Sequence, residues 1–436
     1  MKKTRKNIWI IRLIFAAFII FVIPMTAHSD LKNIVATLHP SISVQEEYSD
    51  NINLTARNRV DDFITTVYTG LTIPPLEATE LKKKNYGIDL DYLFGLVFYA
   101  KETDSNYIKH EGTLNTWYRM SPRWTFRLRE YLIRSQEPRE KYYGPEGLPG
   151  EFVLGTDRGR ATYVRNVFDP EAVYQFGREN RILVHYRNVV YETQSRIFGD
   201  SEDNQGSLGL EYWLNIKNGV AFTYSHSLAT FEKSADFTGQ TAQGRYLYRI
   251  NPKTFGFLEY DYLRRDFDSP LSVDYEVHTG SFGVEHSFNP VLSGKVQLGS
   301  FLEDPETGSN ITGPFYEFFL IQRAKKTAYT LSFRGGYTED YFSAENLGFA
   351  KYNRLLASVT HQLKERTAVD LWSSYERVKY GNGVIDQPWG LGGGISYRMF
   401  KWMVLSLRVA HQENLSSVSI REYSENRATF SATATY

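Results

Sequence analysis

Apolar and polar side chains alternate with a period of two over most of the chain. From Tyr329 to Tyr337 the odd positions read Tyr, Leu, Phe, Gly and Tyr, while the even positions are small or polar. The same alternation recurs from Ile88 to Phe98, from Leu208 to Leu214 and from Leu258 to Tyr262. Period two is the period of a β-strand, whose successive side chains point to opposite faces. We therefore expect an all-β protein with one apolar and one charged face on each strand.

The connections between these segments alternate in length. Short connections rich in Asn, Pro or Gly occur at 121–123, 217–219, 251–253 and 289–290. Longer polar connections fall between them, such as 135–158, 196–205 and 303–313. This asymmetry is typical of bacterial outer-membrane barrels, whose short turns lie in the periplasm.

The pattern predicts a transmembrane antiparallel up-and-down β-barrel over residues 41–436. At about 20 residues per strand and connection, the prediction is about 20 strands, with 18 as the alternative. An even number of strands would place both termini in the periplasm. Two parts are ambiguous: the first hairpin, from Ser41 to Ile73, and the segment from Tyr163 to Phe176, where Asp169-Pro170 either interrupts a strand or marks a loop.

A soluble β-sandwich or propeller is the alternative to a membrane barrel. The sequence shows no repeat of blade length, and a soluble array would not need a Tyr- and Phe-rich outer face on every strand. The alternation also continues to the last residue, with Phe430 and Tyr436 in the apolar phase. A strand that ends the chain on an aromatic residue resembles the signal read by the outer-membrane barrel assembly machinery, so we expect that machinery to act on Tyr436.

The amino terminus has the order of a secretory signal peptide. Five basic residues, the last of them Arg12, precede the apolar run from Leu13 to Ile23, which is followed by the small residues Ala27 and Ser29. We expect a signal peptide over 1–29 and a short periplasmic lead over 30–40. An uncleaved anchor starting at Ile8 is the alternative, but it would bury Arg12.

Composition narrows the chemistry further. The chain of 436 residues contains no cysteine, which excludes disulfides, thiolate metal sites, iron-sulfur clusters and cysteine catalysis. The whole chain carries 50 basic and 50 acidic side chains; loss of the five basic residues in 1–29 leaves 45 against 50. A mildly acidic mature chain argues against nucleic acid as a partner.

Three short segments resemble a known family. They are 46–54 (EEYSDNINL), 62–67 (DFITTV) and 90–94 (LDYLF), with Tyr174 to Gly177 as a further similar strand end. They are similar to the second type of outer-membrane β-barrel porin, in the branch associated with PEP-CTERM and exopolysaccharide systems. The resemblance implies an outer-membrane barrel linked to polysaccharide secretion, with polysaccharide and periplasmic export components as expected partners beside outer-membrane lipid and lipopolysaccharide. It implies no catalytic residue.

Charged residues in the polar phase of the strands are the expected lining of a pore. The candidates are Asp89, Asp91, Arg127, Arg129, Arg187, Glu211, Arg245, Glu259, Asp261, Lys295, Arg334, Asp370 and Arg408. Rings of charge set the solute selectivity of a channel, and a modest excess of Arg would favour anionic solutes. Alternatively, these charges pair across neighbouring strands and only hold a wet lumen together.

Other candidate sites are weak. Six aromatic residues near strand ends fit either interfacial girdles or ordinary β-propensity: Tyr118, Trp124, Tyr337, Trp389, Tyr397 and Trp402. The connection 135–158 could fold into the pore or cover its outside. His185 and His278 are read as inward-facing, and His226, His361 and His411 as lipid-facing. The acidic segments 200–204 and 304–310 lack the full ligand spacing of a calcium loop.

We expect no enzyme, no cofactor and no metal site, because the sequence lacks a nucleophile motif, a phosphate loop or paired histidines at metal spacing. A barrel of about 20 strands encloses more volume than its own side chains fill, and only about ten residues separate Asp30 from the first strand, too few for a plug domain. The predicted function is an outer-membrane channel linked to exopolysaccharide export. A general diffusion porin and a closed structural or adhesive barrel are the alternatives.

Overall fold

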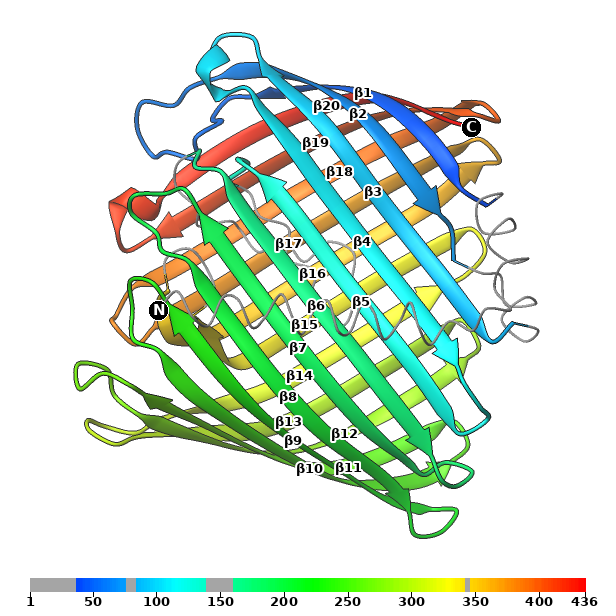
Figure 1. Cartoon of the computed structure of the whole chain (residues 1–436), viewed down its shortest axis with the longest axis vertical. Coiled ribbons are helices and arrows are strands. Elements are labelled where there is room, and N and C mark those ends of the chain that lie inside the picture. Colours follow the sequence, from blue (N-terminus) through cyan, green and yellow to red (C-terminus); the bar gives the residue numbers. More distant parts are fainter. Residues whose placement is uncertain (1–36, 76–83, 139–159, 342–345) are drawn as a thin grey trace.

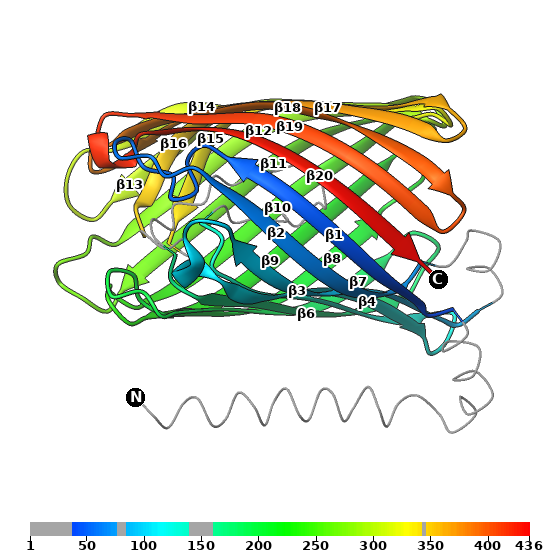
Figure 2. The same cartoon turned by 90° about the horizontal axis from the view of Figure 1, so that it is seen from above.

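The protein is a closed barrel of 20 antiparallel strands (Figures 1 and 2). The computed structural model describes residues 37–75, 84–138, 160–341 and 346–436. Its strands are β1 (His39–Ser49), β2 (Asp62–Ile73), β3 (Tyr86–Tyr99), β4 (Tyr107–Arg119), β5 (Trp124–Ser135), β6 (Tyr163–Gln175), β7 (Arg181–Thr193), β8 (Ser201–Trp213), β9 (Asn218–Phe231), β10 (Phe237–Asn251), β11 (Thr254–Phe267), β12 (Tyr275–Asn289), β13 (Leu292–Pro305), β14 (Ile311–Arg323), β15 (Thr327–Asp340), β16 (Gly348–Lys364), β17 (Thr367–Tyr380), β18 (Ile385–Phe400), β19 (Met403–Ser416) and β20 (Tyr423–Thr435). Among the described residues, two 3-10 turns, η2 (Thr103–Ser105) and η3 (Ser419–Arg421), lie in connections.

Each strand pairs with the next, and β20 pairs with β1 to close the barrel. The closing ladder runs from Ser41 opposite Thr435 to Ser49 opposite Arg427. The predicted fold and the count of 20 strands are confirmed, and the alternative of 18 strands is wrong. The first strand begins at His39, two residues before the predicted start of the barrel.

The two ends of the barrel differ. One end, called here the turn end, carries both barrel termini and the short turns, such as 252–253 and 365–366. The other end, called here the loop end, carries the longer connections, including 50–61 and the two 3-10 turns (Figure 1). The expected alternation of short and long connections is therefore confirmed, except that the connection 74–85 between β2 and β3 is long and lies at the turn end.

Both ambiguous segments form strands. The first hairpin is β1 paired with β2 along its whole length, from His39 opposite Thr72 to Ser49 opposite Asp62. The segment with Asp169-Pro170 is the single strand β6. Its ladder with β5 is unbroken there, whereas the ladder with β7 skips from Phe168 to Glu171. Proline has no N–H to donate to a ladder. The pairing of β6 with β7 is therefore interrupted at Asp169-Pro170, while its pairing with β5 continues.

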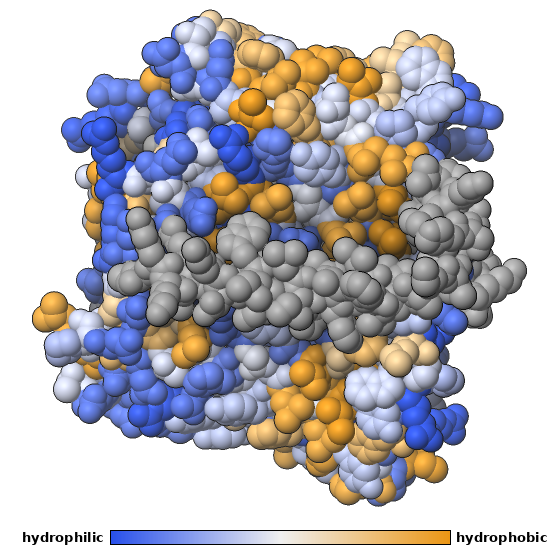
Figure 3. All heavy atoms as spheres, in the orientation of Figure 1, coloured by the Kyte–Doolittle hydropathy of each residue, from blue (hydrophilic) through white to orange (hydrophobic). Residues whose placement is uncertain are grey.

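The outer face of the wall is apolar. Leu258 on β11 is 60% exposed and Phe282 on β12 is 58% exposed, and they lie side by side in register. Around the grey atoms, Figure 3 shows apolar residues over the middle of the barrel and hydrophilic residues gathered at the loop end. Such a band is the lipid-facing surface of a membrane barrel. In the described part of the chain, no helix is long and apolar enough to cross a membrane.

The loop end is held together by buried polar contacts. Arg421 of η3 donates from Nε and Nη2 to Asp386 at the start of β18, at 2.9 and 2.5 Å, and both side chains are almost fully buried. The connection 50–61 is anchored by Asn51, whose side chain donates to the carbonyls of Thr55 and Ser424. The predicted signal peptide and most of the periplasmic lead lie outside the described residues.

Candidate functional site: the inner wall of the barrel

The inner face of the wall is polar where the outer face is apolar. Glu259 and Ser281 lie opposite each other on β11 and β12, in the phase that alternates with Leu258 and Phe282, and each is only 8% exposed. All thirteen predicted pore residues lie in this inward phase of their strands, on β3, β5, β7, β8, β10, β11, β13, β15, β17 and β19. Whether solutes pass along them stays a prediction.

Most of the predicted inward charges have partners on a neighbouring strand. Arg127 and Arg129 on β5 bond to Glu171 and Asp169 directly opposite on β6, at 2.7 and 3.2 Å. Arg245 on β10 bonds to Glu259 on β11. This arrangement supports the alternative in which inward charges pair across strands. It also weakens the hypothesis of an anion path built on free arginines.

The same pairing continues on the other side of the barrel. Lys295 on β13 and Arg334 on β15 share Glu317 on β14, at 2.6 and 3.3 Å. Arg354 on β16 bonds to Glu376 on β17 at 2.9 Å. The inner wall therefore presents alternating charges around its circumference, rather than one sign of charge.

Several residues that pair with the predicted pore residues were not identified as candidates from the sequence. Asp169, Glu171 and Glu317 hold predicted pore residues but were not among the candidates. Each lies in the same polar phase as the candidates, so the alternation could have indicated that it faces inward. The choice of partner depends on register, which comes from the closed ladder and not from the local pattern.

One row of the wall brings a histidine beside a carboxylate and a serine. His185 on β7 donates from Nε2 to Asp169, which also accepts from Arg129, and His185 lies directly opposite Ser207 on β8. The Ser207 hydroxyl, however, donates to Ser225 on β9 at 2.8 Å. A serine nucleophile needs a hydrogen bond to its base, so this row is not an assembled hydrolytic site.

Part of the inner wall is flattened by glycine. Trp372 on β17 lies over Gly390 and Gly392 of β18, and a Cβ atom at these two positions would come within 2.9 and 2.6 Å of the indole ring. The ring can therefore lie against the wall instead of projecting into the lumen. Nearer the turn end, the guanidinium group of Arg249 on β10 stacks over the Trp213 ring of β8, with its Cζ atom 4.2 Å from the ring centroid.

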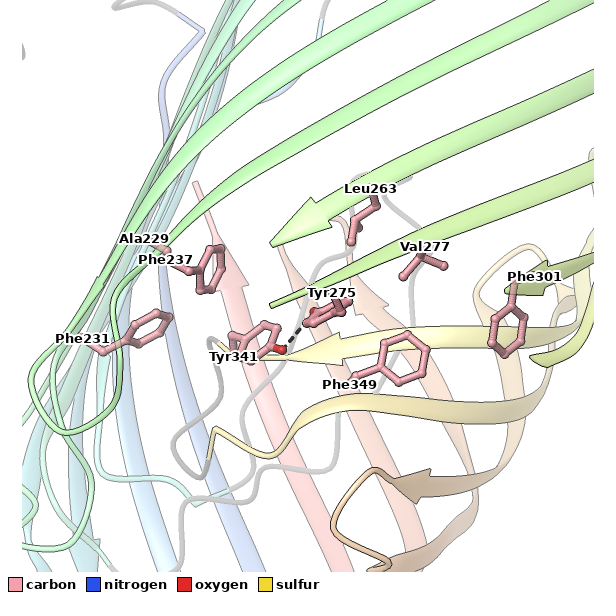
Figure 4. Packing of buried hydrophobic residues seen from close by; sticks show 9 residues of the cluster. All are labelled: Ala229, Phe231, Phe237, Leu263, Tyr275, Val277, Phe301, Tyr341 and Phe349. Atoms are coloured by element: carbon pink, nitrogen blue, oxygen red, sulfur yellow. Dashed lines mark hydrogen bonds between the residues drawn. The ribbon is translucent and has the colours of Figure 1, made fainter. Parts of the chain in front are cut away.

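Aromatic residues fill the inner side of the loop end. The largest buried cluster consists of Ala229, Phe231, Phe237, Leu263, Tyr275, Val277, Phe301, Tyr341 and Phe349 (Figure 4). The Tyr275 hydroxyl is 2.9 Å from that of Tyr341, and burial raises the pKa of the Tyr341 phenol well above its ordinary value, which keeps it neutral. The sequence missed this cluster because its members come from six strands and one connection.

Two predicted orientations are wrong. His278 faces outward, because it shares the phase of Phe282 and Val284 on β12 and lies within 2.7 Å of the hydroxyl of outward-facing Tyr260. Tyr337 is not a girdle residue, because it packs inside the barrel against Phe301 and Phe349. The physical reason is that β15 leaves the wall just before Tyr337.

The structure gives little further information on the remaining candidates from the sequence. In the described part of the chain, no three His, Asp or Glu side chains gather as a metal site. Most of the long connection 135–158, expected either to narrow the pore or to cover its outside, lies outside the described residues. Trp124, Tyr397 and Trp402 are exposed near strand ends, as interfacial residues would be.

Comparisons with solved structures find barrels of low similarity. The outer membrane protein OpdK from Pseudomonas aeruginosa is 9% identical, with a TM-score of 0.41 over 92% of this chain and 99% of that one. OccAB2 from Acinetobacter baumannii is 12% identical, with a TM-score of 0.40 and the same coverages. A mutant of the ferric enterobactin receptor PfeA from Pseudomonas aeruginosa is 8% identical, with a TM-score of 0.49 over 92% of this chain and 80% of that one.

Sequence comparisons give one family. Residues 223–436 match the model of the family described as "Putative beta-barrel porin 2". No curated protein sequence matches the chain. Together with the closed barrel and its apolar outer face, the family match places the chain in the outer membrane as a β-barrel. This confirms the predicted location.

Proposed function

We propose that the barrel is a channel for polar solutes across the outer membrane, with weak selectivity for the sign of charge. The observation that carries this proposal is the inner wall of paired charges. Arg127 with Glu171 and Arg129 with Asp169 keep half-exposed guanidinium groups on the lumen side, each next to a carboxylate. A wall of this kind stays hydrated, because its charged groups lose little contact with water. Paired charges also cancel at a distance, which limits selectivity.

Polysaccharide export is a second candidate within the same class. The flat indole of Trp372 on the glycine stretch of β18 supports it, because an aromatic face offers an apolar platform to the C–H face of a sugar ring. Inward-facing arginines such as Arg249 and Arg127 could offer planar donors to the carboxylates of an acidic polymer. The resemblance of the amino-terminal segments to exopolysaccharide-associated porins favours the same candidate.

The proposed partners follow from the faces and ends of the barrel. The outer face would contact lipid and lipopolysaccharide, with the turn end in the periplasm. The exposed aromatic Tyr436, whose amide donates to the carbonyl of Pro40, would be read by the barrel assembly machinery. Periplasmic export components would be separate proteins.

Single-channel recording tests the proposal. The mature chain, residues 30–436, is refolded, inserted in a planar bilayer and recorded with and without an acidic oligosaccharide. We expect stable conductance steps, and steps that the sugar blocks would favour the polysaccharide candidate over general diffusion. A heat-modifiable, demonstrably folded barrel that never conducts would refute the channel and favour a structural or adhesive role.

A further inference from the structure

The wall of the barrel splits between β14 and β15 toward the loop end. The ladder between these strands ends with Tyr316 opposite Gly335. Beyond that point β14 remains paired with β13 as far as Ile311, and β15 remains paired with β16 as far as Asp340. Residues 311–315 therefore form a free strand edge, while the loop ends of β15 and β16 take another course. We call residues 336–341 and 346–351 the flap.

The flap lies inside the barrel. Glu339 accepts hydrogen bonds from Arg265 of β11 at 2.6 Å and from Tyr275 of β12 at 2.5 Å. Figure 4 shows Tyr341 and Phe349 between the side chains of the inner wall, with β15 running into the interior. These contacts reach four strands back along the sequence from β15, so the flap covers the inner wall of β11 to β13 near the loop end.

The free edge of β14 is protected as edges usually are. The carbonyl of Thr312, which would accept from β15 in a continued ladder, accepts from the Lys351 ammonium at 3.4 Å. Alternate residues of an antiparallel strand direct their backbone groups to the same side, so the nitrogen of Pro314 also faces this edge. Proline has no N–H, and proline and lysine are the residues that tolerate an unpaired edge.

The point of divergence is a pair of glycines. Gly335 lies under the ring of Tyr316, and a Cβ atom there would come within 2.3 Å of it. Gly336 lies under Phe315, where a Cβ atom would be 3.0 Å from the ring. Two adjacent glycines give the backbone freedom to change direction, and the rings of β14 close over the gap on both faces.

We infer that the flap is a gate with two docking positions, one inside the lumen and one on the free edge of β14. In the second position, the ladder would continue in register, with Thr312 opposite Glu339 and Ile311 opposite Asp340. The move exchanges the bonds of Glu339 and Lys351 for ladder hydrogen bonds and uncovers the inner wall at the loop end. Such an element with two alternative sets of partners can switch between discrete states. Its effect on conduction rests on the proposed channel function.

Cysteine pairs test the gate, because the chain contains no cysteine of its own. In the lumen position, Asn346 donates to Ser234 at 2.6 Å, so the pair Ser234→Cys and Asn346→Cys locks the flap inside by oxidation or a short bis-maleimide. The pair Ile311→Cys and Asp340→Cys captures the flap on the edge of β14. The matched control is Ser406→Cys with Ser431→Cys, whose hydroxyls are 2.6 Å apart on the static ladder of β19 and β20.

Cross-linking in folded barrels is read on gels, and conductance is read separately. We expect all three pairs to cross-link, the Ser234 pair to fix a lower conductance that reduction releases, and the Ile311 pair to fix a higher one. If the control pair forms and the Ile311 pair does not, the flap does not reach the wall and the inference is wrong. If both flap pairs form but the barrel conducts in neither position of the flap, the movement of the flap is supported and the proposed channel function is refuted.

Discussion

Close packing of single side chains decides the shape of the lumen. A methyl group at Gly392 would meet the Trp372 ring at 2.6 Å. Gly392→Ala is therefore expected to push the indole away from the wall, lower the single-channel conductance, and destabilise the barrel by about 1–3 kcal/mol through overpacking. Single-channel recording measures the conductance, tryptophan fluorescence reports the position of the indole, and denaturant titration in detergent micelles measures the loss of stability.

Gly244→Ala is the matched control for that substitution. A Cβ atom at Gly244 meets nothing within 4 Å, so neither conductance nor fluorescence should change. Equal effects of the two substitutions would show that the contact with Trp372 is not what matters.

A buried ion pair at the loop end also depends on single residues. Arg421 and Asp386 are 6% and 5% exposed, and removal of one partner leaves the other charge buried. Arg421→Ala is expected to lower the free energy of unfolding by about 3–5 kcal/mol, measured by denaturant titration in detergent micelles. Asp61→Asn, which breaks the solvent-exposed pair with Lys101, should leave the unfolding midpoint unchanged. A small effect at Arg421 would mean that this end relaxes and admits water.

At the scale of the element, each strand separates lipid from water. Leu258 on β11 faces outward, and Gln243 on the neighbouring β10 faces inward, where it donates to Asp261. Leu258→Arg is expected to cost about 2–4 kcal/mol in a bilayer, because a charge on the lipid face near the midplane is poorly solvated. Gln243→Arg should be tolerated, since the new charge meets Asp261 in the lumen. The folding yields of the two variants in lipid vesicles are compared. Similar yields would contradict the assignment of Leu258 to the lipid face and Gln243 to the lumen face.

At the scale of the whole molecule, the balance of charge sets selectivity. In Arg127→Ser with Arg129→Ser, Glu171 and Asp169 lose their arginine partners. The reversal potential in a salt gradient should then shift toward cation preference, most strongly at low salt where screening is weak. The further changes Asp169→Asn and Glu171→Gln should restore the original value.

An unchanged reversal potential in the Arg127 and Arg129 variant would place these pairs away from the path of ions. Loss of a clear anion preference would instead support the hypothesis of an arginine-based anion path. The same measurement thus separates the two interpretations of the inward charges.

Much of the fold was predictable because its signals are local. The alternation around Leu258 and Glu259 indicates a strand and its two faces, and turn residues such as Asn251 and Pro252 indicate where it ends. The inward position of the thirteen pore candidates follows from that phase. The orientation of His278 was wrong because a single polar residue in the apolar phase was read as inward, against the phase of its neighbours Phe282 and Val284.

The sequence by itself determined the class of fold and the two faces of the wall, because side-chain alternation and turn chemistry depend only on near neighbours. The choice between 18 and 20 strands came from the closed ladder. Only the tertiary structure decided which charges pair, since Glu317 meets both Lys295 and Arg334 through the register of three strands. It also decided the course of β15. The alternation from Tyr329 to Tyr337 runs on without a break through Gly335 and Gly336, and only the contacts of Glu339 inside the barrel show that the strand has left the wall.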